Sequence, residues 1–268
     1  MSEQVIKKVL ITGANGFIGG TLMRYYQNHG QDVVGVDLIG NGTDIVEGDI
    51  AQPDTIKDLL QECDVIIHTA ALVSNAMQDS DMWRVNVLAT RNLIEAAKEH
   101  KVRRFVQISS VVAYGNSAEG ELEENHPVHA DGGSYVLTKL ASEHVVLGAQ
   151  ANDSIEVVIL RPGDAYGPGS RPWVIAPLEA IAKNQFMLPA KGEGFFRPIY
   201  IDDLVRGIVM ATSHPDAAGE IFNISCEGYM PAKEYFAPHY QWLGKKGPML
   251  VSTKLALRVS AIASKVAD

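Results

Sequence analysis

The sequence predicts an α/β fold, a doubly wound parallel sheet followed by a smaller C-terminal lobe. Short runs of aliphatic and β-branched residues, typical of buried parallel strands, alternate with stretches of helical periodicity. A glycine-rich turn joins the first strand to the first helix at residues 12–19. An acidic residue, Asp37, ends the second strand. Together these observations indicate an open sheet that binds a ligand at the carboxyl ends of its strands.

Composition argues against several classes of function. The 268 residues are 46% hydrophobic and 21% charged, which is enough apolar material for a sizeable core. The net charge is −9 without a basic run, so we expect no nucleic-acid partner. We expect no signal peptide and no transmembrane segment, since no apolar run approaches the roughly 20 residues needed. Cys63 and Cys226 have neither disulfide nor metal-site spacing, which favours a cytoplasmic protein without a metal.

The expected elements place a first domain at residues 1–165 and a second lobe at 166–268, partly interleaved with the sheet. Strands are expected at residues 9–12, 32–37, 44–50, 64–71, 103–110 and 155–161, with helices at 53–60, 81–100 and 135–151. After Arg161 the regular alternation of strands and helices ends. The second lobe should contain helices at 172–183 and 202–213, strands at 196–201 and 220–224, and a final amphipathic helix at 253–266. We interpret this last helix as a docking helix, the alternative being a helix that lies on a membrane surface.

The glycine turn has the residues that a phosphate-binding loop needs. Gly13 allows a tight turn, Gly16 lets an anion approach the backbone, and Gly19 lets the helix pack closely on the strand. The helix N-terminus then offers free N–H groups to a pyrophosphate. Asp37 lies at the spacing expected of the carboxylate that holds an adenosine ribose. Because no Arg or Lys follows before Lys57, this Rossmann-type pattern predicts NAD rather than NADP.

A second constellation indicates proton transfer. Tyr135 and Lys139 are four residues apart, so both project from one face of a helix. A nearby ammonium would stabilise a phenolate and lower the pKa of the tyrosine, which could then exchange a proton with a substrate oxygen near neutral pH. Ser110 ends the preceding strand, and its hydroxyl could hold the same oxygen.

The whole chain resembles the extended short-chain dehydrogenase/reductase family, in its epimerase/dehydratase and 3β-hydroxysteroid dehydrogenase-like branch. The matching motifs follow in family order: Thr12-Gly-Ala-Asn-Gly-Phe-Ile-Gly19, Asp37, Gly48-Asp-Ile50, His68-Thr-Ala-Ala71, Asn86, Ser109-Ser-Val-Val-Ala-Tyr-Gly115, Tyr135-x-x-x-Lys139, Arg161-Pro, Tyr166-Gly-Pro-Gly169 and Tyr200-Ile-Asp-Asp-Leu204. The resemblance is specific for the family and leaves the substrate open.

The resemblance implies a role for each matching position. Ser110, Tyr135 and Lys139 would be the catalytic residues, and Lys139 would also bind the nicotinamide ribose. The NAD-binding residues would be Gly13, Asn15, Gly16, Phe17, Ile18, Gly19, Asp37, Asp49, Ile50, Ala70, Ala71, Tyr135, Lys139, Pro162, Gly163 and Ala165. It also implies a homodimer that pairs the helices at 81–100 and 135–151.

Other residues have structural interpretations. His68 is expected to be a satisfied core histidine, Asn86 to support helix geometry, and the acidic run at 119–124 to be solvated loop. Arg171 and Arg197 could grip an anionic substrate, although Arg197 could equally form a structural salt bridge. Asp202 and Asp203 are expected to cap a helix.

Residues of the second lobe indicate which class of substrate the protein binds. Nucleotide-sugar members usually carry Asn where this chain has Asp164, and a further acid would repel a diphosphate. Trp173 and neighbouring apolar residues suggest a less polar pocket. The sequence therefore favours hydride transfer between NAD(H) and a hydrophobic secondary alcohol or ketone, hydroxysteroid-like or other. The alternatives are a nucleotide-sugar epimerase or dehydratase using bound NAD, and a non-catalytic NAD-sensing protein.

Overall fold

The computed structural model describes residues 6–73, 78–115, 120–151 and 155–258. This part of the chain forms two compact units: one contains residues up to Pro162 and returns for Ile201–Ile224, and the other contains Gly163–Tyr200 and the residues from Ser225 onward. The sequence placed all of 166–268 in the second lobe apart from some interleaving with the sheet. The segment that rejoins the first unit is a helix and a strand, residues 201–224.

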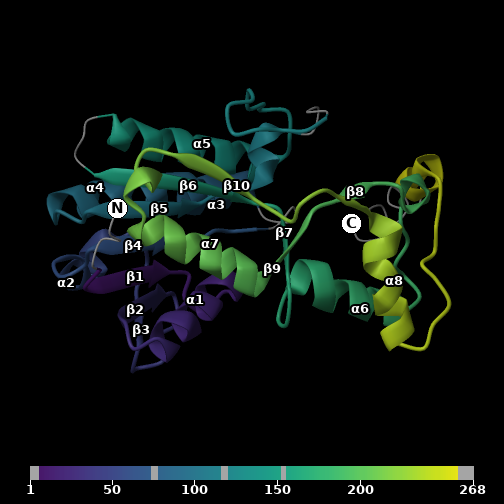
Figure 1. Ribbon diagram of the computed structural model, residues 1–268, viewed down its shortest axis with the longest axis horizontal. Helices are drawn as coiled ribbons and strands as arrows, with labels where there is room; N and C mark the ends of the chain where they lie inside the picture. Colours follow the sequence, from purple (N-terminus) through teal and green to yellow (C-terminus); the bar gives the residue numbers. More distant parts are fainter. Residues whose placement is uncertain (1–5, 74–77, 116–119, 152–154, 259–268) are drawn as a thin grey trace. The chain divides into compact units, whose positions relative to one another are not determined.

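The first unit is built on a parallel sheet. Within the described residues, seven strands pair in the order β10-β6-β5-β4-β1-β2-β3 (Figure 1). Their bounds are β1 Lys8–Thr12, β2 Asp32–Asp37, β3 Ile45–Glu47, β4 Val65–His68, β5 Arg104–Ile108, β6 Glu156–Pro162 and β10 Ile221–Ile224. Every pairing is parallel. This confirms the predicted doubly wound, Rossmann-type fold.

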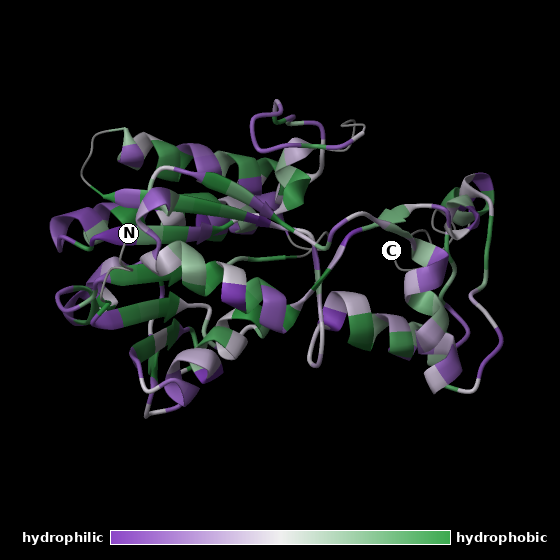
Figure 2. Cartoon of the chain, in the orientation of Figure 1, coloured by the Kyte–Doolittle hydropathy of each residue, from purple (hydrophilic) through white to green (hydrophobic). Residues whose placement is uncertain are grey.

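Helices cover both faces of this sheet. They are α1 Phe17–Asn28, α2 Lys57–Leu60, α3 Asp79–Trp83, α4 Thr90–Glu99, α5 Ser134–Gln150 and α7 Ile201–Ser213, with short 3₁₀ turns at Pro53–Thr55, Val111–Tyr114 and Pro215–Ala217. Helix α1 packs beside α7, and α4 packs beside α5. The strands between these layers are mainly hydrophobic (Figure 2), because residues on both of their faces are buried.

The predicted helix at 81–100 is divided in the structure. A π-helical segment, Arg84–Ala89, separates α3 from α4. A π turn holds one more residue than an α turn and often marks a functional site. Because the extra residue leaves the apolar pattern nearly unchanged, this division of the helix could not be predicted from the sequence.

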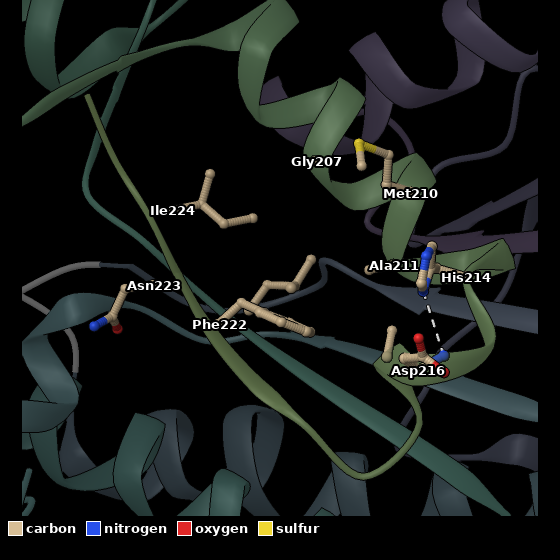
Figure 3. Close-up of a pocket in the computed structure, with 10 residues that line it drawn as sticks. Gly207, Met210, Ala211, His214, Asp216, Phe222, Asn223 and Ile224 are labelled. Carbon is tan, nitrogen blue, oxygen red and sulfur yellow. Dashed lines mark hydrogen bonds between the residues drawn. The ribbon is translucent and has the colours of Figure 1, made fainter. Parts of the chain in front are cut away.

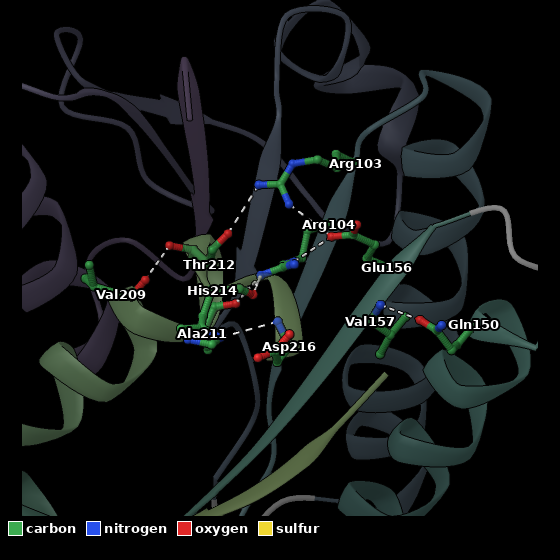
Figure 4. A network of polar contacts seen from close by, with 10 residues as sticks. All are labelled: Arg103, Arg104, Gln150, Glu156, Val157, Val209, Ala211, Thr212, His214 and Asp216. Atoms are coloured by element: carbon green, nitrogen blue, oxygen red, sulfur yellow. Dashed lines mark hydrogen bonds and ion pairs between the residues drawn. The ribbon is translucent and has the colours of Figure 1, made fainter. Parts of the chain in front are cut away.

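Arginines tie the returning helix α7 to the sheet. Arg104, which is fully buried, donates from Nη1 to the carbonyl oxygens of Ala211 and His214, each at 2.8 Å (Figure 4). Arg103 donates to the carbonyl oxygen of Thr212 at 3.2 Å, and both guanidinium groups pair with Glu156. These cations satisfy carbonyl groups that the end of a helix leaves open. Together with the pairing of β10 to β6 and the buried apolar face of α7, they hold residues 201–224 on the first unit.

The second unit is small. It contains β7 Asp164–Tyr166, a π-helical segment Arg171–Ile175, α6 Ala176–Ala182, a 3₁₀ turn Ala190–Gly192, β8 Phe195–Phe196, β9 Pro198–Tyr200, β11 Met230–Pro231 and α8 Ala232–Trp242. The predicted strand at 196–201 is broken at Arg197, because β8 pairs with β11 and β9 pairs with β7. Residues 253–258 are helical, and the rest of the predicted 253–266 helix lies outside the described residues.

Leu188, Phe196, Tyr235 and Phe236 form the core of the second unit, with Trp173 packed against them. The rings of Trp173 and Phe196 meet edge to face, with centroids 4.8 Å apart. Within the described ranges, every helix is too short or too polar to span a bilayer.

Replacing Gly19 with alanine should destabilise the first unit. A Cβ at this buried position would overlap the carbonyl oxygen of Gly13, which is backbone and cannot move without opening the turn. We expect Gly19→Ala to lower the free energy of unfolding by about 1–3 kcal/mol, as overpacking does. Urea unfolding checks this.

The matched control for Gly19 is Gly148, in helix α5, where an added Cβ meets nothing within 4 Å. Gly148→Ala should raise the free energy of unfolding by up to about 1 kcal/mol through helix propensity. Equal effects of the two substitutions would contradict the close approach of α1 to the turn.

Candidate active site

A cavity lies where the winding of the sheet reverses. Strand β1 has β2 on one side and β4 on the other, so the chain leaves their carboxyl ends in opposite directions and opens a crevice there. The cavity has a volume of about 290 Å³. It is lined by Gly13, Gly16, Val36, Asp37, Leu38, Gly48, Asp49, Ile50, Thr69, Ala70, Ala71, Leu72, Arg84 and Val85. The structure thus brings together seven of the predicted cofactor-binding residues: Gly13, Gly16, Asp37, Asp49, Ile50, Ala70 and Ala71.

The glycine loop is shaped as a cradle. Gly13 has φ +70°, and a Cβ there would lie 2.8 Å from the backbone of Ala70. Gly16 precedes α1, whose first turn holds Phe17, Ile18 and Gly19 and no acidic residue. The first N–H groups of a helix have no intrahelical acceptor, so they are free to bind an anion. A pyrophosphate fits this loop in shape and charge.

Asp37 is fixed to the glycine loop. Its Oδ2 accepts a hydrogen bond from the Asn15 backbone N–H at 2.9 Å, and its Oδ1 accepts one from the Leu38 N–H at 2.8 Å. The Asn15 side chain donates to the carbonyl oxygen of Ile39 at 2.7 Å. These bonds hold the carboxylate at the rim of the cavity. Each oxygen retains a second lone pair with which it can accept from a ribose hydroxyl.

Several lining residues were not predicted as site residues from the sequence. Thr69 lies inside a recognised motif, and its hydroxyl donates to the carbonyl oxygen of Thr12 at 2.6 Å. Arg84 and Val85 reach the cavity from the π-helical segment. Arg84 supplies a cation that no local motif indicated. Its approach to the cavity depends on the position of the π-helical segment in the chain.

Ser110, Tyr135 and Lys139 come together in the first unit. Ser110 caps the 3₁₀ turn after β5, and Tyr135 and Lys139 occupy the first two turns of α5. The Ser110 side chain hydrogen-bonds that of Tyr135. The Lys139 Nζ atom lies 5.9 Å from the centroid of the Tyr135 ring and donates to the carbonyl oxygen of Ile108 at 2.9 Å. This geometry can hold a substrate oxygen at the tyrosine hydroxyl.

The acidities differ from the expectation. Burial raises the pKa of Tyr135 to about 12, and the hydrogen bond to Ser110 offsets only part of that rise. This rise is opposite to the lowering of the tyrosine pKa that was expected from Lys139. Burial also lowers the pKa of Lys139 to about 8, although the carboxylate of Glu143 opposes this change. Near neutral pH Tyr135 is protonated and Lys139 is a cation.

Buried polar side chains support these residues. His68 lies between the hydroxyls of Thr12, 2.7 Å from Nδ1, and Thr90, 2.9 Å from Nε2. Burial lowers its pKa to about 3, so it is the neutral, satisfied core histidine that was predicted. Asn86 bonds both backbone groups of Leu72 and donates to the Thr138 hydroxyl at 3.1 Å. It joins the loop after β4 to helix α5.

The acidic loop is more than solvated surface. Glu124 accepts a hydrogen bond from the Asn223 backbone N–H at 2.7 Å, and the carbonyl oxygen of Glu123 accepts one from the Tyr114 hydroxyl at 3.0 Å. This part of the loop is therefore anchored to β10 and to the 3₁₀ turn after Ser110. Glu119 lies outside the described residues.

The remaining predicted residues are divided between the two units. Pro162 ends β6 in the first unit, whereas Gly163 and Ala165 belong to the second unit. Trp173 packs on the core of the second unit. Exposed Arg171 lies near Glu179, with a closest contact of 3.4 Å. Arg197 forms no ion pair with another described residue, and its backbone N–H donates to Asp164 Oδ2 at 3.1 Å. The predicted cap residues Asp202 and Asp203 lie in the first turn of α7.

A larger hollow of about 430 Å³ lies elsewhere in the first unit, between α7 and β10 (Figure 3). Its lining is mainly apolar and includes Met210 on α7 and Phe222 and Ile224 on β10. It contains none of the predicted cofactor or catalytic residues. The smaller cavity, by contrast, is lined by the glycine loop and by Asp37.

Known proteins share this arrangement. The sequence profile described as "NAD dependent epimerase/dehydratase family" matches residues 9–225. A dTDP-glucose 4,6-dehydratase from Streptomyces niveus is 29% identical over 243 residues, covering 81% of this chain and 72% of that protein. A 3 beta-hydroxysteroid dehydrogenase/Delta 5-->4-isomerase from Mycobacterium tuberculosis is 26% identical over 271 residues, covering 94% of this chain and 73% of that protein.

Solved structures agree with the sequence comparison. MoeE5, solved in complex with UDP-glucose and NAD, is 28% identical and superposes with a TM-score of 0.80. The match covers 91% of this chain and 86% of that one. These relatives include proteins named for sugar nucleotides and for steroids, so the comparison leaves the substrate open.

Asp164, in the second unit, is the ionisable group that bears on the choice between a sugar nucleotide and a steroid as substrate. It lies on β7, and burial raises its pKa to about 6 despite the hydrogen bond from the Arg197 N–H. An acid that binds its proton more tightly in the folded state loses stability as the pH rises from its unfolded to its folded pKa. For Asp164 that window runs from about pH 4 to pH 6.

Asp164→Asn should remove this pH dependence. At pH 7 we expect the variant to unfold with a free energy higher by on the order of 1–2 kcal/mol, and at pH 4 to match the wild type. Urea unfolding followed by tryptophan fluorescence at pH 4, 5, 6 and 7 measures this. Glu227→Gln, at an exposed carboxyl of the same unit, is the control. A variant with the wild-type pH dependence would show that Asp164 titrates as a solvated acid.

Proposed function

Because the chain belongs to the NAD-dependent epimerase/dehydratase family, we propose that it is an oxidoreductase that interconverts a hydrophobic secondary alcohol and its ketone. The observation that carries this proposal is the grouping of Ser110, which follows β5, with Tyr135 and Lys139 on helix α5, in the unit that also contains the nucleotide cavity. A protein that only senses NAD has no chemical need of a buried lysine beside a tyrosine ring.

The cofactor is NAD. The glycine loop at Gly13 and Gly16 would hold its pyrophosphate, Asp37 its adenosine ribose, and Asp49 and Ile50 its adenine. When bound, NAD accepts or supplies the hydride at its nicotinamide ring. Phe17 and Ile18 would contribute backbone N–H groups to the pyrophosphate, and Ala70 and Ala71 would lie along the nicotinamide half.

Tyr135 moves the proton. In its protonated form it donates from Oη to the oxygen of a ketone, and Ser110 hydrogen-bonds that oxygen and orients it. For an alcohol, Tyr135 must first give up its proton, and the Lys139 cation favours the resulting phenolate. Near neutral pH Tyr135 is in the protonated form that ketone reduction requires.

A hydrophobic substrate is supported by the second unit. Its aromatic core, its buried acid Asp164, and the carboxylate of Glu179 beside Arg171 would all disfavour a diphosphate. Arg197, which has no ion-pair partner among the described residues, could bind a single carboxylate or hydroxyl. Trp173 would pack against an apolar ring.

A nucleotide-sugar epimerase or dehydratase is the second candidate. It is favoured by the likeness to MoeE5, whose structure holds UDP-glucose and NAD. Such an enzyme would retain NAD and show no net production of NADH. The two candidates therefore differ in how tightly the cofactor is held as well as in the substrate.

Native mass spectrometry and NADH fluorescence distinguish the candidates. We expect the protein to bind NAD reversibly and to form NADH from a secondary alcohol in a sterol panel, and to show no mass increase with UDP-sugars. Tyr135→Phe should lower turnover by about 10²- to 10⁴-fold, as loss of a general acid–base group does, while NAD affinity changes little.

Retained NAD together with a bound UDP-sugar would overturn the dehydrogenase proposal in favour of the epimerase or dehydratase. NAD binding without turnover of any alcohol, ketone or sugar nucleotide, and with no effect of Tyr135→Phe, would favour a sensor. Gly148→Ala is a control for both measurements, since it lies on the same helix as Tyr135 and near its other end.

We also propose a homodimer through the surface of α4 and α5. Leu88, in the π-helical segment that leads into α4, is 52% exposed, and α4 and α5 pack side by side. Leu88→Glu should convert a dimer, of twice the 29.1 kDa chain mass, to a monomer in light scattering. Met210→Glu is the control, because Met210 on α7 is 63% exposed. A wild-type monomer at micromolar concentration would contradict the dimer.

A cytoplasmic location is the remaining proposal. Cys63 and Cys226 are both free thiols, and Cys63 is buried, with its thiol donating to the carbonyl oxygen of Val65 at 3.0 Å. A reducing compartment keeps such thiols free.

A further inference from the structure

A buried charged cluster lies beside the catalytic residues and has no role in the proton transfer described above. It consists of Ser109, Glu143 and Arg161, which are respectively 4%, 2% and 3% exposed. Ser109 directly precedes Ser110, Glu143 follows Lys139 by one helical turn, and Arg161 lies near the end of β6. Buried charges are costly, so their presence calls for an explanation.

Glu143 is at the centre of this cluster. The Ser109 hydroxyl donates to Oε1 of Glu143 at 2.5 Å. Arg161 donates from Nε to the same oxygen at 3.0 Å and from Nη2 to Oε2 at 2.7 Å. The guanidinium carbon also lies 4.7 Å from the centroid of the Tyr114 ring. One carboxylate therefore joins helix α5 to the ends of β5 and β6.

The same carboxylate acts on Lys139. Residues four apart on a helix lie on one face, about 5–6 Å apart at Cβ. Burial lowers the pKa of Lys139, and Glu143 is the charge that opposes this. Other groups near Lys139 are Tyr135 on its own helix and the neutral His68 on β4, while Arg161 on β6 is the ion-pair partner of Glu143. Asp79 and Asp81 on α3, Arg84 in the π-helical segment, and Glu95 on α4 belong to elements around α5 but are exposed.

We propose that Glu143 is a positioning residue of the active site: it fixes the Ser109–Ser110 end of β5 against α5 and supplies the negative charge that keeps Lys139 a cation. Its importance for turnover rests on the proposed function, in which the Lys139 cation favours the Tyr135 phenolate. Its effect on the charge of Lys139 does not depend on any substrate.

The test measures the titration of Lys139 directly. Lysine residues labelled with ¹³C at Cε report protonation by NMR, and the Lys139 signal is the one missing from Lys139→Met. We expect Lys139 to titrate near pH 8 in the wild type and at about pH 7 or lower in Glu143→Gln. At pH 8 the protonated fraction would then fall about fivefold, and the alkaline limb of turnover should move by the same interval.

Two variants separate the charge of Glu143 from its hydrogen bonds. Ser109→Ala removes the bond to Glu143 but leaves its charge, so Lys139 should titrate as in the wild type while turnover falls through Ser110. Glu156→Gln removes the partner of buried Arg104 at the opposite ends of the same strands, β5 and β6 (Figure 4). It should destabilise the protein without moving the titration of Lys139.

Arg161→Met provides a second test of the proposal if Glu143→Gln does not fold. It removes a cation from the carboxylate, so Lys139 should titrate at a higher pH than in the wild type. An unchanged titration in either folded variant would overturn the proposal. If the shifts appear but no alcohol, ketone or sugar nucleotide is turned over, the proposed function fails while the positioning role of Glu143 stands.

Discussion

The close approach of helix α1 to the glycine turn is the constraint on which the site depends. Gly19 packs against the carbonyl group of Gly13, and Gly13 in turn approaches the backbone of Ala70. The first strand, the first helix and the end of β4 are thereby brought into contact at one point. Because the sheet reverses its winding at that same point, the helix N-terminus and the carboxylate of Asp37 share a cavity. This contact positions Gly13 and Ala70, which both line the cavity.

The parts of the molecule that could be predicted are those encoded within a few residues. The glycine turn, the strand that ends at Asp37, and the pairing of Tyr135 with Lys139 each depend on spacing along one segment. Their positions follow once the strands alternate with helices, since parallel strands bring all of their carboxyl ends to one edge. The fold class was predictable for the same reason.

The parts that could not be predicted depend on contacts between distant segments. Arg84 reaches the cavity only because a π turn precedes α4, and the apolar pattern is nearly the same for either kind of turn. Residues 201–224 return to the first unit through the pairing of β10 with β6 and through contacts with Arg103 and Arg104, about a hundred positions earlier in the chain. The tyrosine pKa was predicted in the wrong direction, because sequence spacing shows a neighbouring cation but does not show burial.

Arg104 is buried at one end of β5 and β6, and Arg161 is buried at the other. Because a buried charge needs a partner, each of these arginines forms an ion pair. At one end Arg104 pairs with Glu156 and binds carbonyl groups at the end of α7, and at the other Arg161 on β6 pairs with Glu143 on helix α5. An ion pair in the interior contributes little net stability, since desolvation offsets most of the attraction. The first pair instead satisfies helix carbonyl groups. The second includes a carboxylate four residues from buried Lys139, and this carboxylate opposes the lowering of the lysine pKa by burial.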